Sequence, residues 1–379
     1  MLLERPQFEN SLLQKNSVES KDVLSENTPH SVKGVKSVHF KQPFELESGA
    51  VLPELTIAYN TYGDLNETKD NVVWVCHALS ANSDVADWWS GLIGEGKFFD
   101  PKKYFIVCAN MIGSHYGSTS ALSINPETGK FYGKSFPVIT IRDIARAHQM
   151  LADFLTIEKI KIALGGSMGG QQVLEWAIQN PDFFSQIALI ACGANMTPWS
   201  IGLNETQRMA IDADPTFADA YISKLKSRDA LIDAGAKGLE AARAIGMMSY
   251  RSYSGYNLAQ NDTRNNIDAF KVQTYQRYQG EKLRKRFSAL CYYSISKTMD
   301  SHNVGRNRES IHAALSKITT RTLVVGIETD ILFPLEEQVT LASHITNKEF
   351  RVIQSKFGHD GFLIEFDQMQ RHLSNFFVD

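Results

Sequence analysis

The sequence contains few cysteines and no long apolar run. Its four cysteines stand at positions 76, 108, 192 and 291 without a C-x-x-C pair, and three of them fall at or near the ends of apolar, strand-like segments. We interpret them as reduced thiols in a core. No stretch of about 18 apolar residues is present, and the first 20 residues mix both charge signs without the apolar centre of a signal peptide. We therefore expect a cytoplasmic protein without membrane association.

The chain also lacks a surplus of one charge and any metal-binding motif. Its formal net charge is −3 over 379 residues, which provides no basic field for nucleic acid or for an acidic membrane surface. Neither an H-E-x-x-H motif nor a cluster of cysteine and histidine residues at ligand spacing occurs, so we expect no metal site. A small molecule is the substrate class that remains.

The pattern along the chain predicts one interrupted α/β domain. Residues 1–36 are rich in Asn, Ser, Glu and Lys with little apolar periodicity, which predicts a loosely ordered leader. Alternation begins at Val38 with a predicted antiparallel hairpin, and strands then alternate with helices over 37–193 and again over 319–379. This predicts a mostly parallel central sheet flanked by helices. Residues 194–318 have helical periodicity, which predicts an inserted helical lid.

The most informative stretch is 159–181, KIKIALGGSMGGQQVLEWAIQNP. It has the pattern of a strand, a glycine-rich turn and a helix, and Gly165, Ser167 and Gly169 form G-x-S-x-G in the turn. Glycines allow a bend sharp enough to expose the serine hydroxyl, so Ser167 is the candidate nucleophile. The N–H of Met168, at the positive end of the helix, is a candidate oxyanion donor. The alternative is a closely packed or phosphate-binding turn, but the Lys-Ser/Thr of a P-loop is absent.

Two further residues complete a catalytic triad in the order typical of hydrolase folds. Asp330 ends a late strand and His359 follows the last one, so the chain order is Ser, Asp, His. His359 would accept the proton of Ser167, and Asp330 would hold the imidazole. Taken singly, each could be an ordinary turn or loop residue. Leu79, after an earlier strand, is the candidate for the second oxyanion N–H, whereas His148 on a helical face is interpreted as a packed histidine.

With these motifs in order, the sequence resembles the homoserine O-acetyltransferases of the α/β-hydrolase superfamily. These enzymes use acetyl-coenzyme A in methionine synthesis. The resemblance extends from about Val38 to the C-terminus. The motifs that carry it are HALS at 77–80, DWWSGLIGEGKFFD at 87–100, GGSMGGQQVLEWA at 165–177, LNETQRMAI at 203–211 and FGHDGFL at 357–363.

The resemblance implies a fold, a reaction and a set of site residues. It implies an α/β-hydrolase fold and a ping-pong transfer of acetyl from acetyl-CoA to L-homoserine through an acyl-serine, without a bound cofactor. It also implies a homodimer that pairs through the lid. The implied roles are nucleophile, acid and base for Ser167, Asp330 and His359, oxyanion donors for the backbones of Leu79 and Met168, and substrate contacts for Arg243 and Asp360.

The two substrate contacts have alternatives in the sequence itself. On a helix, Arg243 shares a largely apolar face, and its guanidinium either clamps the carboxylate of homoserine or lies in water or against Glu240. Asp360 either holds the ammonium of homoserine or caps a last helix that begins near Gly361.

Three other functions remain open at this level. A relative of the same family could use a succinyl donor or serine as acceptor, because one residue of a pocket wall can decide this. The stretch 117–121 has the sequence GSTSA where the family commonly has G-S-T-G-P. An esterase would use the same triad with water as acceptor. A binding protein on an inactive hydrolase fold would have lost a triad member, whereas all three are present here.

Overall fold

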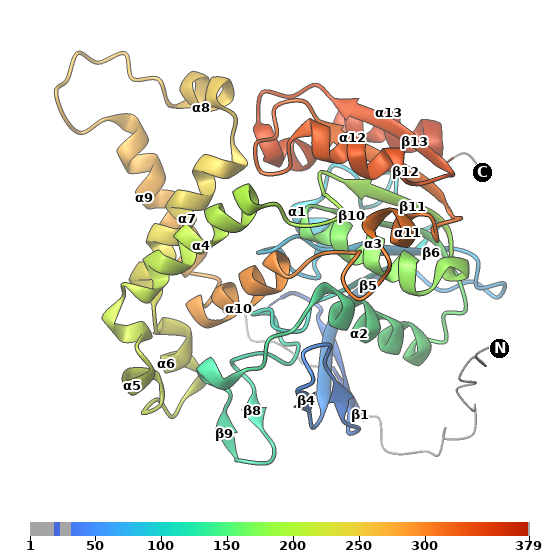
Figure 1. Ribbon diagram of the computed structural model, residues 1–379, viewed down its shortest axis with the longest axis horizontal. Helices are drawn as coiled ribbons and strands as arrows, with labels where there is room; N and C mark the ends of the chain where they lie inside the picture. Colours follow the sequence, from blue (N-terminus) through green and yellow to red (C-terminus); the bar gives the residue numbers. More distant parts are fainter. Residues whose placement is uncertain (1–18, 23–31, 378–379) are drawn as a thin grey trace.

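The computed structural model describes residues 19–22 and 32–377, which build a central sheet with helices on both faces (Figure 1). The described sheet has nine strands in the order β1-β2-β5-β7-β6-β10-β11-β12-β13. Their bounds are β1 (Glu19–Asp22), β2 (Lys36–Phe40), β5 (Leu55–Tyr62), β6 (Val72–Cys76), β7 (Phe105–Ala109), β10 (Ile160–Gly166), β11 (Phe184–Ile190), β12 (Arg321–Ile327) and β13 (Lys348–Ile353). All pairs from β7 to β13 are parallel, and the pairs from β1 to β7 are antiparallel. The predicted mostly parallel sheet is confirmed.

Helices cover both faces because the central strands are apolar on both. In β6, Val73 and Val75 belong to one buried core, while Trp74 and Cys76 belong to the other. The first core is covered by α1 (Val85–Trp88) and α13 (Phe366–Phe376), and the second by α2 (Ile141–Phe154), α3 (Met168–Gln179) and α12 (Leu335–Ser343). A strand buried in this way has no polar face, which explains its unbroken apolar sequence.

Short elements connect these layers. The predicted opening hairpin is confirmed as the antiparallel pair of β2 and β5, in which Phe40 lies opposite Leu55. Helix α2 begins after Thr140, whose side chain accepts the N–H of Asp143 while the Asp143 carboxylate accepts the N–H of Thr140. The remaining short elements are β3 (Phe44–Glu45), β4 (Val51–Leu52), β8 (Ile124–Asn125), β9 (Lys130–Phe131) and the 3₁₀ helices η1 (Gly133–Ser135) and η2 (Pro181–Phe183).

The chain between β11 and β12 is helical. Its elements are α4 (Pro198–Asp212), η3 (Pro215–Phe217), α5 (Asp219–Ile222), α6 (Arg228–Asp233), α7 (Ala236–Tyr250), α8 (Tyr253–Gln260), α9 (Lys271–Arg284), α10 (Ala289–Asp300) and α11 (Ile311–Leu315). Helices α4 to α9 gather to one side of the sheet, at the left of Figure 1. The boundaries expected for the lid, 194 and 318, lie in the connections before α4 and after α11.

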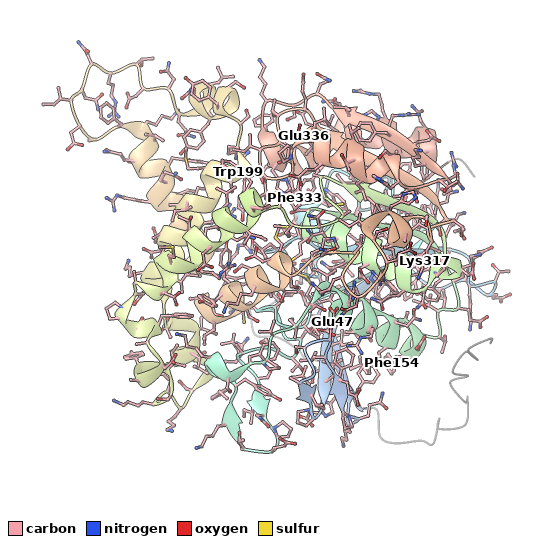
Figure 2. All side chains as sticks on the ribbon, viewed as in Figure 1. Glu47, Phe154, Trp199, Lys317, Phe333 and Glu336 are labelled. Atoms are coloured by element: carbon pink, nitrogen blue, oxygen red, sulfur yellow. The ribbon has the colours of Figure 1, made fainter. Side chains whose placement is uncertain are left out.

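The two ends of this helical region lie side by side. The N–H of Met196 donates to the carbonyl of His302 at 2.9 Å, and the N–H of Val304 donates to that of Ala194 at 3.0 Å. The returning segment is also tied to the core by Glu47, which lies beside α2 (Figure 2) and pairs with Arg306 at 2.7 Å. The two ends of the helical region are therefore held together next to α2.

Within the leader expected over 1–36, the structure describes one strand. Residues 19–22 form β1, which pairs with β2 in the register Glu19↔His39. Backbone groups alone satisfy such an edge pairing, so the apolar pattern of the sequence contains no signal for it. The rest of 1–31 lies outside the described residues. Within 19–22 and 32–377, no helix is both long enough and apolar enough to cross a membrane.

Candidate active site

The predicted turn between β10 and α3 places Ser167 in a strained conformation. Its φ is 57° and its ψ is −128°, a backbone geometry that non-glycine residues rarely adopt and that costs about 1–3 kcal/mol. The backbone N–H of Ser167 donates to the carbonyl of Ile190 on β11 at 2.9 Å, which holds the turn at the end of the strand. The serine side chain does not cap the helix. This geometry is that of a nucleophile elbow.

The glycines of the turn are required by close packing. A Cβ added at Gly169 would lie 2.2 Å from the carbonyl oxygen of Cys76, and one added at Gly165 would lie 2.4 Å from the backbone of Gly169. Neither contact can be relieved by a side-chain rotation, because each involves backbone atoms. Helix α3 can therefore approach β6 and β10 only with glycine at these two positions.

Asp330 and His359 form a buried hydrogen-bonded pair. Asp330 follows β12, and its Oδ1 accepts the N–H groups of Leu332 at 2.8 Å and Phe333 at 2.9 Å. Its Oδ2 lies 2.7 Å from Nδ1 of His359. Because a carboxylate accepts, the proton of the neutral ring is on Nδ1, and Nε2 is left as the basic nitrogen.

The charge of Asp330 decides the basicity of His359. Burial lowers the pKa of His359, but the charge of Asp330 and its hydrogen bond raise it, and the charge of Asp360 adds to this. The net result is a pKa above the ordinary value of 6.5. Such a shift matches the pKa of a base to its task.

Ser167 and His359 line one pocket of about 390 Å³ between the sheet and the helical region. The core contributes loop residues 78–82 and 359–363, and the helical region contributes Asn204, Arg243, Tyr250, Lys282, Arg286 and Met299. Helix α4 rests on the loop that carries Asp330, where Trp199 Nε1 donates to the carbonyl of Ile331 at 2.6 Å. Figure 2 shows Trp199 and Phe333 near each other at this contact.

Arg243 of α7 lines the same pocket, and the alternative contact with Glu240 is absent among the described ion pairs. Glu240 is instead engaged by Arg284 at 2.8 Å and by Lys237 at 3.0 Å. The guanidinium of Arg243 lies 5.3 Å from the ring centre of Tyr250, and its buried Nε has no hydrogen-bond partner in the described part of the chain. A buried donor without an acceptor is rare in folded proteins, so this position favours an anionic ligand.

Asp360 is not a helix cap. The last helical region divides into a 3₁₀ helix, η4 (Gly358–Leu363), and α13, so Asp360 lies inside η4 rather than directly before a helix. The expected helix start near Gly361 is therefore wrong. Burial raises the pKa of Asp360, whereas Arg251, Arg243 and His359 lower it, and the net shift is upward. Its carboxylate pairs with Nε of Arg251 at 3.3 Å and lines the pocket.

The two expected oxyanion donors have free N–H groups. Neither the N–H of Leu79 nor that of Met168 donates to an acceptor within the described residues, and both residues are buried. Met168 is the first residue of α3, where no intrahelical acceptor exists. Leu79 lines the pocket, and Met168 directly follows Ser167, which also lines it, so these buried, unpaired backbone donors suit an oxyanion.

The pocket also contains residues that the sequence did not single out by role. Trp88, Tyr250, Lys282 and Arg286 line it, and of these only Trp88 belongs to a motif noted in the sequence. Asn204 also lines it and belongs to the motif LNETQRMAI. The folding of the helical region brings Tyr250, Lys282 and Arg286 into the pocket. No local sequence pattern predicts that these three residues reach it.

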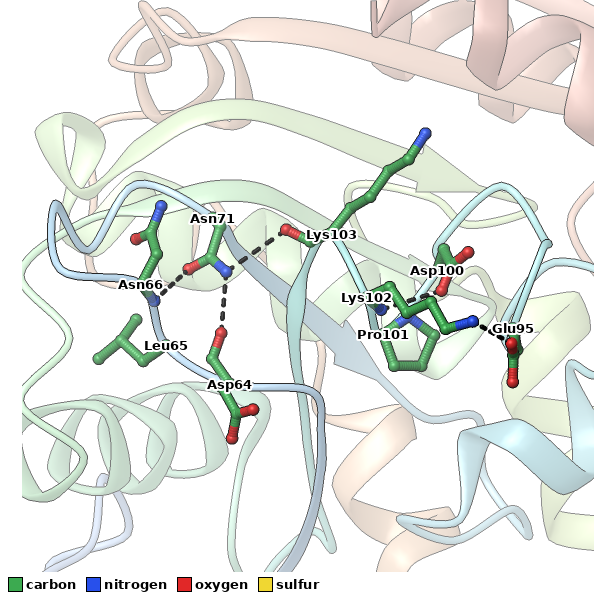
Figure 3. Close-up of a pocket in the computed structure, with 9 residues that line it drawn as sticks. All are labelled: Asp64, Leu65, Asn66, Asn71, Glu95, Asp100, Pro101, Lys102 and Lys103. Carbon is green, nitrogen blue, oxygen red and sulfur yellow. Dashed lines mark hydrogen bonds and ion pairs between the residues drawn. The ribbon is translucent and has the colours of Figure 1, made fainter.

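A second cavity, of about 560 Å³, shares no lining residue with the pocket of Ser167 (Figure 3). Its lining comes from 64–71 and 95–103, and several of its polar groups contact one another: Asn71 Nδ2 donates to the carbonyl of Asp64, and Lys102 pairs with Glu95. It contains neither a serine nor a histidine.

No group of three or more His, Cys, Asp or Glu side chains suited to a metal ion occurs among the described residues.

Comparisons with known proteins agree with this arrangement. The family profile of the alpha/beta hydrolase fold matches residues 71–366. The homoserine O-acetyltransferase of Cyclobacterium marinum is 48% identical over 339 residues, which are 89% of this chain and 94% of that protein. The crystal structure of homoserine O-acetyltransferase from Bacillus anthracis has a TM-score of 0.82 at 22% identity, covering 90% of this chain and 97% of the other.

A further solved structure, the acetyl esterase MekB, has a TM-score of 0.78 at 27% identity and covers 90% of this chain and 96% of the other. The similarity to the Cyclobacterium protein spans nearly the full length of both chains, and the family profile covers more than half of this chain. The chain therefore belongs to the homoserine O-acetyltransferase family of the α/β-hydrolase fold.

Proposed function

We propose that this protein transfers an acetyl group from acetyl-CoA to the hydroxyl of L-homoserine by way of an acetylated Ser167. The observation that carries the proposal is one pocket that contains a serine on a strained turn, a histidine paired with a buried carboxylate, and a guanidinium whose buried Nε has no hydrogen-bond partner among the described residues. The serine, the histidine and the carboxylate suit acyl transfer, and the guanidinium suits an amino-acid acceptor. Membership of the family supports the same reaction.

In the first half-reaction, Ser167 attacks the thioester carbon. His359 Nε2 accepts the serine proton, and the N–H groups of Leu79 and Met168 stabilise the negative oxygen of the tetrahedral intermediate. The C–S bond then breaks, and His359 gives its proton to the departing thiolate of CoA. Acetyl-Ser167 remains.

In the second half-reaction, the hydroxyl of homoserine attacks the acetyl carbon. His359 accepts the hydroxyl proton, the bond from carbon to Ser167 Oγ breaks, and the serine regains the proton. Water in place of homoserine would give hydrolysis by the same steps, so the acceptor must be positioned well to compete.

We assign the positioning of homoserine to Arg243 and Asp360. The guanidinium of Arg243 can bind the α-carboxylate through two parallel hydrogen bonds. The carboxylate of Asp360 lies directly after the base in sequence and can hold the ammonium, because its contact with Arg251 uses Oδ2. Together the two groups would fix the acceptor at both charged ends.

We expect Arg243→Lys to slow acetyl transfer to homoserine on the order of a hundredfold and to leave acetyl-enzyme formation near the wild-type rate. An ammonium cannot reproduce two parallel hydrogen bonds, and a misplaced acceptor reacts slowly. Rapid-quench mass spectrometry would follow the appearance of acetyl-enzyme with acetyl-CoA and its decay after homoserine is added.

The matched control is Arg284→Lys, which alters a guanidinium of the neighbouring helix that pairs with Glu240. Both half-reactions should be unchanged in this control. Normal decay of the acetyl-enzyme in Arg243→Lys would remove Arg243 from the acceptor site.

The experiment that tests the whole proposal is a steady-state assay of L-homoserine and L-serine against acetyl-CoA and succinyl-CoA. We expect the pair homoserine and acetyl-CoA to have the highest kcat/KM, with O-acetylhomoserine identified by mass. A preference for succinyl-CoA or for serine would overturn the acetyl or homoserine assignment and leave the acyl-serine mechanism standing.

The second candidate function is an esterase, which the likeness to the acetyl esterase MekB favours. An esterase would release acetate from acetyl-Ser167 at a rate that homoserine does not change. The same assay separates the two, because a transferase consumes the acetyl-enzyme faster as the homoserine concentration rises.

We further propose a homodimer that pairs through the helical region. Three side chains of that region, Tyr253, Leu258 and Ile267, are largely exposed, and apolar groups of this size favour burial against a partner. The particle mass from light scattering should then be twice that of the chain.

We place the enzyme in the cytoplasm, since all four cysteines are buried and free of disulfides.

A further inference from the structure

A histidine beside the active site has both ring nitrogens engaged. His77 follows β6 and is completely buried. Its Nε2 lies 3.1 Å from the N–H of Met111, and its Nδ1 lies 2.9 Å from the carbonyl oxygen of Ala78. A backbone N–H can only donate, so Nε2 is the acceptor and the ring proton is on Nδ1. The contacts thus determine the tautomer, and Nδ1–H donates to Ala78.

The acceptor of that proton belongs to a peptide group of the oxyanion site. The carbonyl of Ala78 and the N–H of Leu79 are the two ends of one planar peptide. Holding the oxygen therefore orients the N–H, which is the expected oxyanion donor. A hydrogen bond to the carbonyl also polarises the peptide and strengthens its N–H as a donor.

A second side chain connects the two backbone segments that carry the oxyanion donors, through the carbonyls next to their peptides. Gln172 of α3 donates from Nε2 to the carbonyls of His77 at 3.0 Å and Met168 at 3.1 Å. Its Oε1 lies 2.9 Å from Nε2 of His148, which is buried between Trp74 and Trp176 as the packed histidine expected from the sequence. One amide therefore ties the loop with Leu79 to the first turn of α3.

We propose that His77 is a positioning residue of the oxyanion hole, which orients the Leu79 N–H through the carbonyl of Ala78 with support from Gln172. The inference rests on the proposed acyl-serine chemistry and adds a residue to it. Burial lowers the pKa of His77 to about 4, which keeps the ring neutral and the Met111 contact intact at the pH where a basic His359 works.

Two substitutions separate the contacts of His77. Asparagine places its amide nitrogen near the position of Nδ1 and can still donate to Ala78. Glutamine places its carbonyl oxygen near the position of Nε2. It can therefore accept the N–H of Met111, but it no longer donates to the carbonyl of Ala78. Both introduce an amide of similar polarity at the same buried position, so each serves as the control for the other.

We expect His77→Gln to slow acetyl-enzyme formation and its breakdown by about a hundredfold each, because one oxyanion donor is worth about 10²–10³ in rate. His77→Asn should recover to within about tenfold of wild type. The KM for acetyl-CoA and the pH midpoint of the rate should stay near wild type in both, since neither variant touches the substrate pocket or His359. Thermal melting of each variant is measured alongside.

Equal rates in the two variants, or rate losses that follow the loss of folded protein, would overturn the inference. If His77→Gln does not fold, Gln172→Met keeps His77 and removes the connecting amide, and an unchanged rate in that variant would also count against it. Each measurement is repeated with p-nitrophenyl acetate, whose hydrolysis needs the same oxyanion hole. Wild-type protein that cleaves this ester but forms no acetyl-enzyme from acetyl-CoA would contradict the proposed function, while the asparagine and glutamine contrast would still test His77.

Discussion

Ser167→Ala should abolish acetyl transfer, with a loss on the order of 10⁶ in kcat, as expected when the nucleophile of an acyl-serine mechanism is removed. Wild-type enzyme mixed with acetyl-CoA and no acceptor should gain the mass of one acetyl group, and the variant should gain none. Homoserine should then discharge the wild-type intermediate and give ping-pong kinetics. The physical reason is that no other hydroxyl occupies the strained turn between β10 and α3.

Ser114→Ala is the matched control for this experiment. Ser114 is also fully buried, and its hydroxyl has no hydrogen-bond partner in the described part of the chain, so its removal should cost little. Activity and acetylation should be retained in this control. Substantial transfer by Ser167→Ala, together with kinetics that require both substrates bound at once, would show that the strained turn is not the site of covalent chemistry.

Asp330→Asn should lower kcat by about 10⁴, because an amide can present a donor to Nδ1 and favour the wrong tautomer of His359. The fold should persist, since the amide oxygen can still accept the N–H groups of Leu332 and Phe333. Acetylation rate and thermal melting, measured on the same sample, separate a catalytic loss from a structural one.

The pH dependence of the acetylation rate tests the same pair a second time, because the direction of the expected shift is specified. A base acts when neutral, so wild-type acetylation should fall as the pH drops through the raised pKa of His359. Without the charge of Asp330, burial dominates and lowers that pKa, so the residual activity of Asp330→Asn should persist to lower pH. The stability of the wild-type fold depends on pH in the opposite direction. Protonated His359 paired with Asp330 stabilises the fold below the unfolded pKa of about 6.5. This contribution is lost as the pH rises through the folded pKa of His359.

Glu337→Gln is the control for charge near this pair. Burial raises the pKa of Glu337 and so does the neighbouring charge of Asp330, but Glu337 does not act on His359. Its substitution should leave the pH midpoint of acetylation unchanged. An unshifted midpoint in Asp330→Asn as well would mean that another group, not His359, titrates in the profile.

Several features could be predicted from the sequence because they depend on neighbours in the chain. The turn around Ser167 follows from glycines whose Cβ atoms would strike backbone, and the start of α2 follows from the mutual hydrogen bonds of Thr140 and Asp143. The strands that bury both faces have continuous apolar runs. The positions of Asp330 and His359 after late strands follow from the rule that functional loops gather at one end of a parallel sheet.

What the chain determines locally is therefore the fold class and the candidate triad, and the tertiary structure decides the rest of the site. The pairing of Asp360 with Arg251, the engagement of Glu240 by Arg284 and the hydrogen bond from Arg286 to the carbonyl of Ser80 join segments that the local pattern does not relate. The tautomer of His77 likewise depends on Met111, 34 positions away. Such contacts arise when packing brings distant segments together, and a single sequence has no periodicity that encodes them.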